Sequence, residues 1–238
     1  MTIDIGNSNL KVAFFEHEKM DGFYTLQAPW RDDLDLLISS KNPEKAIISD
    51  VRGLDKELMN FLNDKVNYLR LTNTLVLPFL ISYETPETLG SDRLANAAGA
   101  AKLFPDKNNL IVDCGTCITY TLVNKGHLIG GSISPGIQMR LNALHHFTGK
   151  LPLVEFRSEL TQIPGKNTVD SIRTGVINAI IAETDGLISQ YCSLFTDLNV
   201  ILTGGSMAFF EKHLKSPIFA VPYLTHEGLH EILKINNI

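Results

Sequence analysis

Hydrophobic and polar positions alternate over the first part of the chain and predict a β-meander there. Residues 2–17 read TIDIGNSNLKVAFFEH, which favours two strands joined by a turn at 6–9, and residues 22–27 favour a third strand. Helical and strand-like patterns then alternate, with expected elements at 32–40 (helix), 46–49 (strand), 54–63 (amphipathic helix) and 68–71 (strand). Such alternation is typical of parallel strand pairing, so this region is predicted to be α/β.

The second part of the chain repeats that plan. The segments NLIVDCGTCITYTLV (109–123) and HLIGGSIS (127–134) predict another meander, and later strands are expected at 199–202 and 218–221. Helices are expected at 136–147, at 168–195 and after Gly204-Gly205. The polar break at 105–109 predicts a boundary between two domains, 1–108 and 109–238.

The long helix predicted at 168–195 carries its own start signal. Thr168 is expected to be its N-cap, and Asp170 in the first turn complements the positive end of the helix dipole. Ile172, Val176 and Ile180 form an apolar stripe at helical spacing, and Gly186 marks a point where the helix is expected to bend.

Each predicted meander contains an Asp-x-Gly turn, Asp4-Ile5-Gly6 in the first and Asp113-Cys114-Gly115 in the second. Glycine accepts positive φ and has no side chain, so the N–H groups of such a turn can face a phosphate. The neighbouring carboxylate suggests a cation held together with that phosphate. Either turn alone is equally an ordinary hairpin turn, but the pair in matching places predicts a phosphate-binding site.

Composition excludes several classes of function. Lys and Arg number 21 and Asp and Glu number 26, a net charge of −5, so the chain has no basic footprint for nucleic acid. The start of the chain has no signal-peptide pattern, and no apolar run reaches the roughly 18 residues of a membrane span. Three cysteines fit a reducing compartment better than a disulfide framework. We therefore expect a cytoplasmic protein without a membrane partner.

Cys114-Gly115-Thr116-Cys117 matches the Cys-x-x-Cys pattern of redox pairs, but its context differs. A redox pair lies at a helix N-terminus that lowers the thiol pKa, whereas residues 118–123 are predicted to continue as a strand. Zinc would need two further ligands, and no histidine lies at a recognisable metal spacing. His145-His146 falls on a predicted helix and favours a surface or packing position.

Six segments together resemble the type III pantothenate kinases, nearly from end to end: DIGNSNLK (4–11), Tyr83 with LGSDRLANAAGA (89–100), VDCGTCITYTLV (112–123), GGSISPG (130–136), NTVDSIRTG (167–175) and VILTGG (200–205). The resemblance implies the acetate and sugar kinase, Hsc70 and actin superfamily. Its fold is α/β, with duplicated ribonuclease H-like (actin-like ATPase) halves, mixed sheets and an ATP cleft between them. The implied activity is the ATP-dependent phosphorylation of pantothenate to 4'-phosphopantothenate, the first step of coenzyme A biosynthesis.

The resemblance also implies a substrate site. Asp92 corresponds to the general base, although its local pattern alone also fits a helix N-terminal aspartate beside a surface arginine. Pantothenate, the implied partner molecule, would be bound by Tyr83, Gly90, Ser91, Asp92, Arg93 and Thr168. In family homodimers that threonine comes from the neighbouring subunit, so the chain is expected to form a homodimer.

The implied cofactors are ATP, magnesium and a monovalent cation, potassium or ammonium. The ATP-binding residues would be Asp4, Ile5, Gly6, Asn7, Ser8, Asn9, Leu10, Lys11, Thr116, Gly204 and Gly205, with Asp4 also positioning magnesium and Asp113 binding the monovalent cation. For Lys11, a phosphate contact and a solvent-facing side chain both remain open. The chain departs from the family at Ser8, where threonine is usual, and at Cys117, where alanine is common.

Three other functions are alternatives to a pantothenate kinase. A catalytically silent nucleotide-binding regulator of the same fold would be expected to lose Asp4, Asp92 or Asp113, all of which are present. A redox or metal-binding protein would depend on the cysteine pair. A sugar or acetate kinase would usually have a longer chain without the Gly90–Arg93 segment.

Overall fold

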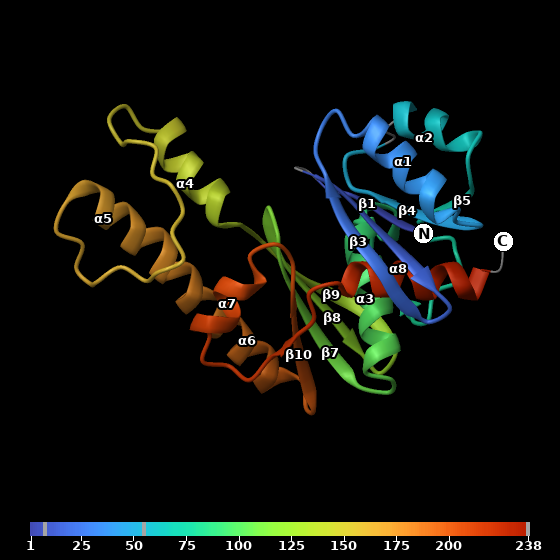
Figure 1. Cartoon of the computed structure of the whole chain (residues 1–238). Helices are drawn as coiled ribbons and strands as arrows, with labels where there is room; N and C mark the ends of the chain where they lie inside the picture. The colour runs from blue at the N-terminus through green and yellow to red at the C-terminus, as the bar shows by residue number, and fades with distance from the viewer. Residues whose placement is uncertain (7–8, 54–55, 237–238) are drawn as a thin grey trace. The chain divides into compact units, whose positions relative to one another are not determined.

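The computed structural model describes residues 1–6, 9–53 and 56–236 (Figure 1). By its internal contacts the chain divides into two units. Unit 1 comprises residues 1–106, 125–130 and 223–238, and unit 2 comprises residues 107–124 and 131–222. The C-terminal segment thus packs with the N-terminal part of the chain. The predicted boundary at residue 108 lies close to one crossing between units, and the chain crosses between them at three further places.

Unit 1 contains a five-stranded mixed sheet in the order β3-β2-β1-β4-β5. The meander is antiparallel, while β4 pairs in parallel with both β1 and β5. The strands are β1 (Thr2–Ile5), β2 (Leu10–Glu16), β3 (Lys19–Leu26), β4 (Lys45–Asp50) and β5 (Asn67–Arg70). These strands confirm the meander and the parallel pairing expected from the sequence pattern.

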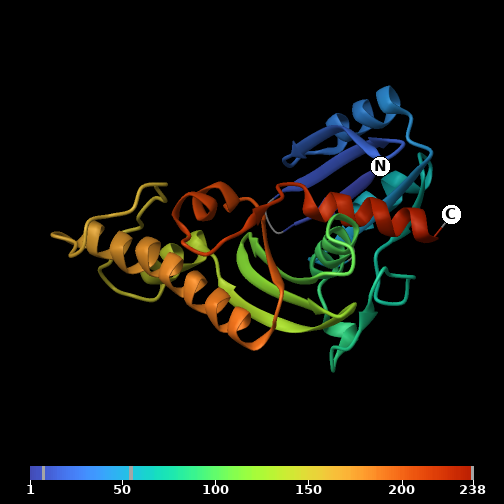
Figure 2. The same ribbon diagram turned by 90° about the horizontal axis from the view of Figure 1, so that it is seen from below.

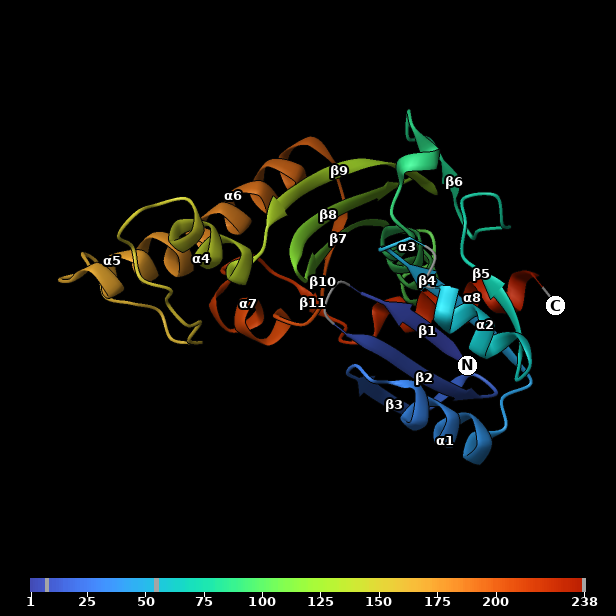
Figure 3. The ribbon, with the colours of Figure 1, turned by 90° about the horizontal axis from the view of Figure 1, so that it is seen from above.

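The two faces of this sheet carry different layers (Figure 3). One face buries Ile3 and Ile5 of β1 in a core with Leu34 of α1 (Arg31–Lys41) and Leu58 of α2 (Lys56–Asn63). Because side chains alternate along a strand, Thr2 and Asp4 lie on the opposite face. That face is covered by α3 (Ser91–Leu103) and α8 (Leu224–Asn236), which contact β4 and β1.

Helix α8 has no counterpart among the predicted elements. Its Gly228 lies against α3, where a Cβ would clash with the Ala95 carbonyl oxygen and come within 2.6 Å of the Gly99 nitrogen. Thr2 Oγ1 of β1 lies 2.7 Å from the buried His226 Nδ1. The helix is therefore anchored to both α3 and β1, and Figure 2 shows it beside α3.

Unit 2 repeats the strand order of unit 1. The strands follow one another as β11-β10-β7-β8-β9, with β7 antiparallel to β8 and parallel to β10. Their bounds are β7 (Asn108–Cys114), β8 (Cys117–Asn124), β9 (His127–Pro135), β10 (Leu198–Thr203) and β11 (Phe219–Ala220). The first residues of β9 belong to unit 1, where they pair with the short strand β6 (Leu80–Ile81).

The helices of unit 2 pack on one face of its sheet around Val112, Tyr120 and Leu202. They are α4 (Ile137–His146), α5 (Thr168–Arg173), α6 (Ala179–Leu194) and α7 (Met207–His213). A π-helical turn at Thr174–Asn178 joins α5 to α6, so the predicted helix at 168–195 is continuous but not α-helical throughout (Figure 2).

One detail of that predicted helix was wrong. Asn167, not Thr168, is the N-cap: its backbone is extended, and its side chain accepts a hydrogen bond from the Asp170 N–H. The irregular turn lies at 174–178, and α6 runs through Gly186 without interruption. Among the described residues, no helix is long and apolar enough to cross a membrane.

Candidate active site

The first Asp-x-Gly turn connects the two central strands of unit 1. Asp4 is buried and pairs in register with Lys11 of β2 and Ser49 of β4, so the three residues share one face of the sheet. Burial, and next the positive charge of Lys11, lower the pKa of His226 on α8 to about 3, which places Lys11 on this covered face.

Gly6 of this turn has no unusual backbone conformation, and its special feature is the space beside its Cα. The Gly6 N–H donates to the Asn9 carbonyl oxygen at 3.1 Å, and φ of Gly6 lies outside the left-handed region. Among the described residues, a Cβ on Gly6 would meet only the Asn9 oxygen, at an ordinary 3.6 Å. The described part of the chain therefore leaves room for a ligand at Gly6. The predicted site residues Asn7 and Ser8 lie outside the described residues.

Two other predicted ATP-binding residues of this segment are buried in the core. Ile5 and Leu10 belong to the hydrophobic cluster of unit 1. Any contact between these residues and a nucleotide would therefore come from their backbone groups.

Asp92 is the second residue of α3, which begins at Ser91 after the N-cap residue Gly90. One carboxylate oxygen, Oδ1, accepts a hydrogen bond from the Arg93 N–H at 2.8 Å. A Cβ on Gly90 would clash with that oxygen, so glycine is needed for the carboxylate to fold back over the helix start. Burial, the largest cause, raises the pKa of Asp92, while the Arg93 N–H and the Arg93 charge act in the opposite direction. A carboxyl with a raised pKa is suited to general base catalysis.

Arg93 is held beside Asp92 with only 5% of its surface exposed. Its guanidinium lies over the Tyr83 ring, 5.5 Å from the ring centre, and Nη2 donates to the Gly130 carbonyl oxygen at 3.3 Å. Ser82, next to Tyr83, is itself attached to β9 by its N–H, which donates to the Leu128 carbonyl oxygen. The structure therefore brings together Tyr83, Gly90, Ser91, Asp92 and Arg93, all within unit 1.

The second Asp-x-Gly turn lies at the corresponding place in unit 2. Asp113 pairs in register with Thr119 of β8 and with Thr203 of β10. The Gly115 N–H donates to the Cys117 carbonyl oxygen at 3.1 Å, and φ of Gly115 is also outside the left-handed region.

The N-cap residues of two helices, α4 and α7, donate hydrogen bonds to the backbone of this second turn. The N–H of Gly136, the N-cap of α4, donates to the Thr116 carbonyl oxygen at 3.0 Å, and the Ser206 N–H donates to the Cys114 carbonyl oxygen at 2.9 Å. Gly204 has φ +94°, and a Cβ there would clash with Asp113 Oδ1. Thr116 and Gly205 are exposed, and a Cβ on Gly205 would meet nothing within 4 Å. Asp113, Thr116, Gly204 and Gly205 thus form one cluster in unit 2.

Thr168 is not brought to the other predicted substrate residues within one unit. It is exposed at the first position of α5 in unit 2, whereas Tyr83 and residues 90–93 belong to unit 1.

The cysteine pair does not lie at a helix start. Cys117 begins β8, as expected from the strand pattern, and Cys114 is fully buried at the end of β7. Burial, and next the charge of Asp113, raise the pKa of the Cys114 thiol. A raised thiol pKa disfavours the reactive thiolate, so this position does not resemble a redox centre.

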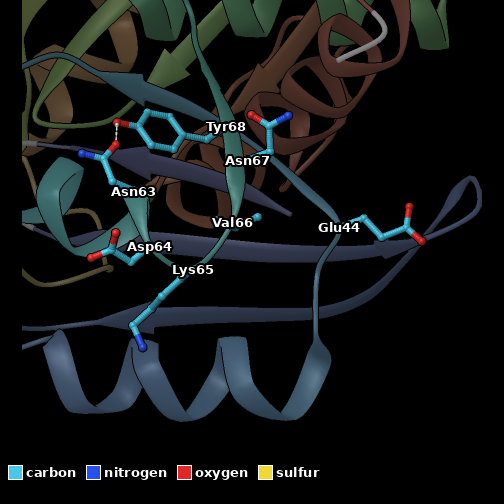
Figure 4. Close-up of a pocket in the computed structure, with 7 residues that line it drawn as sticks. All are labelled: Glu44, Asn63, Asp64, Lys65, Val66, Asn67 and Tyr68. Carbon is cyan, nitrogen blue, oxygen red and sulfur yellow. Dashed lines mark hydrogen bonds between the residues drawn. The ribbon is translucent and has the colours of Figure 1, made fainter.

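A surface depression of about 670 Å³ in unit 1 lies among residues with no predicted role (Figure 4). Its lining is mostly polar and exposed: Glu44, Asn63, Asp64, Lys65, Val66, Asn67 and Tyr68. Within it, the Tyr68 hydroxyl donates a hydrogen bond to Asn63 Oδ1 at 3.0 Å. We assign this depression no part in the candidate active site.

Sequence reasoning missed one residue of the site region, Ser49. Its fully buried hydroxyl lies 3.0 Å from the Ser91 hydroxyl. A polar residue at the end of the apolar strand 46–49 was the only sign in the sequence that Ser49 has a special role. Its contact with α3 joins segments that are far apart in the sequence, so the pattern could not predict it.

The two sheets with the same strand order, each with a central Asp-x-Gly turn, define the duplicated ribonuclease H-like fold of the actin-like kinases. A model of the type III pantothenate kinase family matches residues 1–190. The chain therefore belongs to the type III pantothenate kinase family.

Two relatives match almost the whole chain. The type III pantothenate kinase of Cytophaga hutchinsonii is 42% identical over 237 residues, with 99% of each chain covered. That of Bacteroides fragilis is 41% identical over 239 residues, covering 100% of this chain and 98% of the relative.

Solved structures support the fold. A Campylobacter jejuni protein described as a candidate Baf family transcriptional activator has a TM-score of 0.63 at 24% identity, covering 99% of this chain and 98% of its own. A Listeria monocytogenes protein described as a candidate N-acetylmannosamine kinase has a TM-score of 0.56 at 12% identity, covering 99% of both chains. At these identities the likeness concerns the fold alone.

Proposed function

We propose that this chain phosphorylates pantothenate with ATP, giving 4'-phosphopantothenate and ADP at the start of coenzyme A biosynthesis. The observation that carries the proposal is the start of α3, where a half-buried Asp92 with a raised pKa lies directly beside the buried Arg93. Membership of the family supports the same reaction. No observation on the described residues favours a catalytically silent regulator, since Asp4, Asp92 and Asp113 are all in place.

The residues of α3 would act on pantothenate as follows. Asp92 takes the proton of the primary hydroxyl while the hydroxyl oxygen bonds to the γ-phosphorus and the bond from that phosphorus to the ADP oxygen breaks. Arg93 binds the carboxylate of pantothenate through its guanidinium, held in orientation by Tyr83 and the Gly130 carbonyl oxygen. Most of the rate enhancement in phosphoryl transfer comes from alignment and charge stabilisation, to which the fixed Arg93 and Asp92 would contribute.

The two turns would hold the phosphoryl donor. In unit 1, Gly6 to Asn9 and Lys11 are the proposed phosphate contacts, supported by the open space at Gly6 and by the shared face of Lys11 and Asp4. Asp4 would hold magnesium, which neutralises phosphate charge and commonly binds one or two carboxylates together with phosphates. In unit 2, Thr116, Gly204 and Gly205 are proposed to contact ATP, and Asp113 to bind potassium or ammonium.

A homodimer is proposed for this chain, with Thr168 completing the substrate site of the neighbouring subunit. Support comes from the exposed apolar side chains on and after α4 in unit 2, including Phe147 at 81% and Ile163 at 69% exposure. Exposed apolar side chains that gather into one patch favour a protein partner. Sedimentation showing only monomer at working concentrations would contradict the dimer. We also propose a cytoplasmic location, supported by the three free cysteines.

A coupled assay of ADP release tests the proposed function. The purified chain is assayed with magnesium and ATP, with and without pantothenate, in sodium, potassium and ammonium salts. Pantothenate-dependent ADP release that is lost in Asp92→Asn would support both the reaction and the base, and stimulation by potassium or ammonium that is lost in Asp113→Asn would support the cation site. ATP binding without turnover in any salt would contradict the proposed function.

A further inference from the structure

The start of α3 is fastened to the sheet of unit 1 by a pair of hydroxyl groups. Ser91 Oγ lies 3.0 Å from Ser49 Oγ, and the same oxygen accepts a hydrogen bond from the Asp50 N–H at 3.1 Å. Ser49 is fully buried and Ser91 half-buried, so water competes little for this contact. The Ser91 side chain is therefore turned toward β4.

This contact lies between the two aspartates of unit 1 that carry the proposed chemistry. Ser49 is the register partner of Asp4 across the parallel β1–β4 pair, and Ser91 immediately precedes Asp92. One strand pairing and one hydroxyl contact thus connect the Asp4 backbone to the Asp92 backbone. Both α3 and β4 are labelled in Figure 3.

The contacts of α3 with α8 lie farther along the helix. Thr225 Oγ1 of α8 donates to Asn96 Oδ1 at 2.7 Å, Gly99 packs against α8, and Lys102 pairs with Glu227 at 2.7 Å. These contacts fix the middle and the end of the helix against α8. The hydroxyl pair fixes its first turn against the sheet.

We infer that Ser49 and Ser91 are positioning residues, which hold Asp92 at a fixed distance from the Asp4 turn for phosphoryl transfer. The inference rests on the proposed function, and it assigns Ser91 differently from the resemblance, which makes this residue a pantothenate ligand. A hydroxyl already engaged by Ser49 and the Asp50 N–H is better suited to hold the helix than to bind substrate. Small displacements of a catalytic group lower turnover strongly, whereas the substrate contacts of Arg93 would be kept.

The test compares kcat and the pantothenate KM of Ser91→Ala, Ser49→Ala, the double variant and Ser91→Thr. Each alanine variant is expected to lower kcat about tenfold and to change KM less than about twofold. The double variant should be no slower than the slower single variant, because either substitution breaks the same contact. Ser91→Thr keeps the hydroxyl and should restore most of kcat, which a general loss of stability would not explain.

Matched controls make the outcomes decisive. Ser40→Ala also removes a hydroxyl from a helix of unit 1, one that donates to the Leu37 carbonyl oxygen, and should leave kcat unchanged. If the buried Ser49→Ala variant does not fold, the comparison of Ser91→Ala with Ser91→Thr still decides.

Several results would overturn the inference. These are a raised pantothenate KM at unchanged kcat in Ser91→Ala, losses in kcat that multiply in the double variant, or no loss in either single variant. Turnover of the unaltered chain is measured in the same assay. Its absence would overturn the proposed function, and the positioning role with it, whereas normal turnover with any of those variant results would overturn the positioning role alone.

Discussion

The two Asp-x-Gly turns lie at the same place in two sheets of the same order, yet their surroundings differ. Asp4 and Asp113 each have one antiparallel and one parallel partner in register. At the first turn, a Cβ on Gly6 would make just one contact among the described residues, an ordinary one with the Asn9 oxygen. At the second turn, Gly136 and Gly204 have no room for a Cβ, because the turn itself fills that space.

This difference indicates that the repeated strand order determines the position of each aspartate but not the function of the turn that follows it. The described residues of unit 1 leave space beside Gly6. Unit 1 also has Asp92, at the start of α3, on the same face of its sheet. In unit 2, the N-cap residues of α7 and α4 donate backbone hydrogen bonds to the turn at 2.9 and 3.0 Å. We expect substitutions in unit 1 to affect chemistry and ligand binding, and those around the second turn to affect stability first.

The largest expected effect is on turnover in unit 1. Asp92→Asn should lower kcat by roughly 10² to 10⁴, the usual contribution of a positioned base, while ATP affinity is kept. Since burial disfavours the ionised carboxyl, the neutral amide should not lower the melting temperature. Steady-state kinetics and ATP titration measure both. Asp64→Asn, an exposed change of the same charge, is the control, and near-normal turnover in Asp92→Asn would refute the assignment of the base.

The second prediction contrasts Gly6 of the first turn with Gly204, which follows β10 and packs against the second turn. Gly204→Ala should destabilise the chain by roughly 2 kcal/mol or more, because φ is +94° and the new Cβ would come within 2.6 Å of the Cys114 nitrogen. For a chain of this length, the melting temperature should fall by about 4–8 °C. Gly6→Ala should change stability by less than about 0.5 kcal/mol and weaken ATP binding instead.

Thermal unfolding and ATP titration of both variants test this contrast. Gly205→Ala is the stability control within unit 2, because its Cβ would meet nothing within 4 Å. A Gly6→Ala variant as unstable as Gly204→Ala would show that the two turns do not differ in the proposed way.

The sequence pattern predicted the frame well because the frame depends on local periodicity. Alternation in TIDIGNSNLKVAFFEH and NLIVDCGTCITYTLV was enough for both meanders, and the strand–helix alternation for the parallel pairing. Helix α8 escaped prediction because Gly228 lies in mid-helix and because His226 and His230 are buried polar residues, which break the apolar pattern.

Long-range contacts set the rest of the site, and the sequence could not predict them. The contact of Ser49 with Ser91 and the approach of Gly204 to Asp113 depend on how distant segments pack. The N-cap at Asn167 instead of Thr168 was a choice between two adjacent residues that both cap helices well.

A third prediction concerns pH and compares a carboxyl of each unit. Burial raises the pKa of Asp92 above its ordinary 3.8, whereas the hydrogen bond from Arg140 lowers the pKa of Glu183 in unit 2. A general base acts only when deprotonated, so kcat/KM should fall, as pH decreases, at a higher pH than for an ordinary aspartate. Glu183→Gln should leave that acidic limb in place, since Glu183 has no proposed role in the reaction. The pH profile of kcat/KM measures this, and an acidic limb at or below 3.8 would contradict a base with a raised pKa.

The smallest effect is expected at the second turn itself, in Cys117→Ala. The turn is closed by the backbone carbonyl of Cys117, which accepts the Gly115 N–H, and the substitution keeps that group. The half-exposed thiol makes no contribution to the proposed reaction, so kcat and both KM values should change by less than about twofold. Steady-state kinetics under reducing and oxidising conditions measures this, with exposed Cys192→Ala as the control. A large loss in Cys117→Ala alone would mean that the thiol side chain, and not only the backbone of this turn, takes part in function, and the division of roles between the two turns would fail.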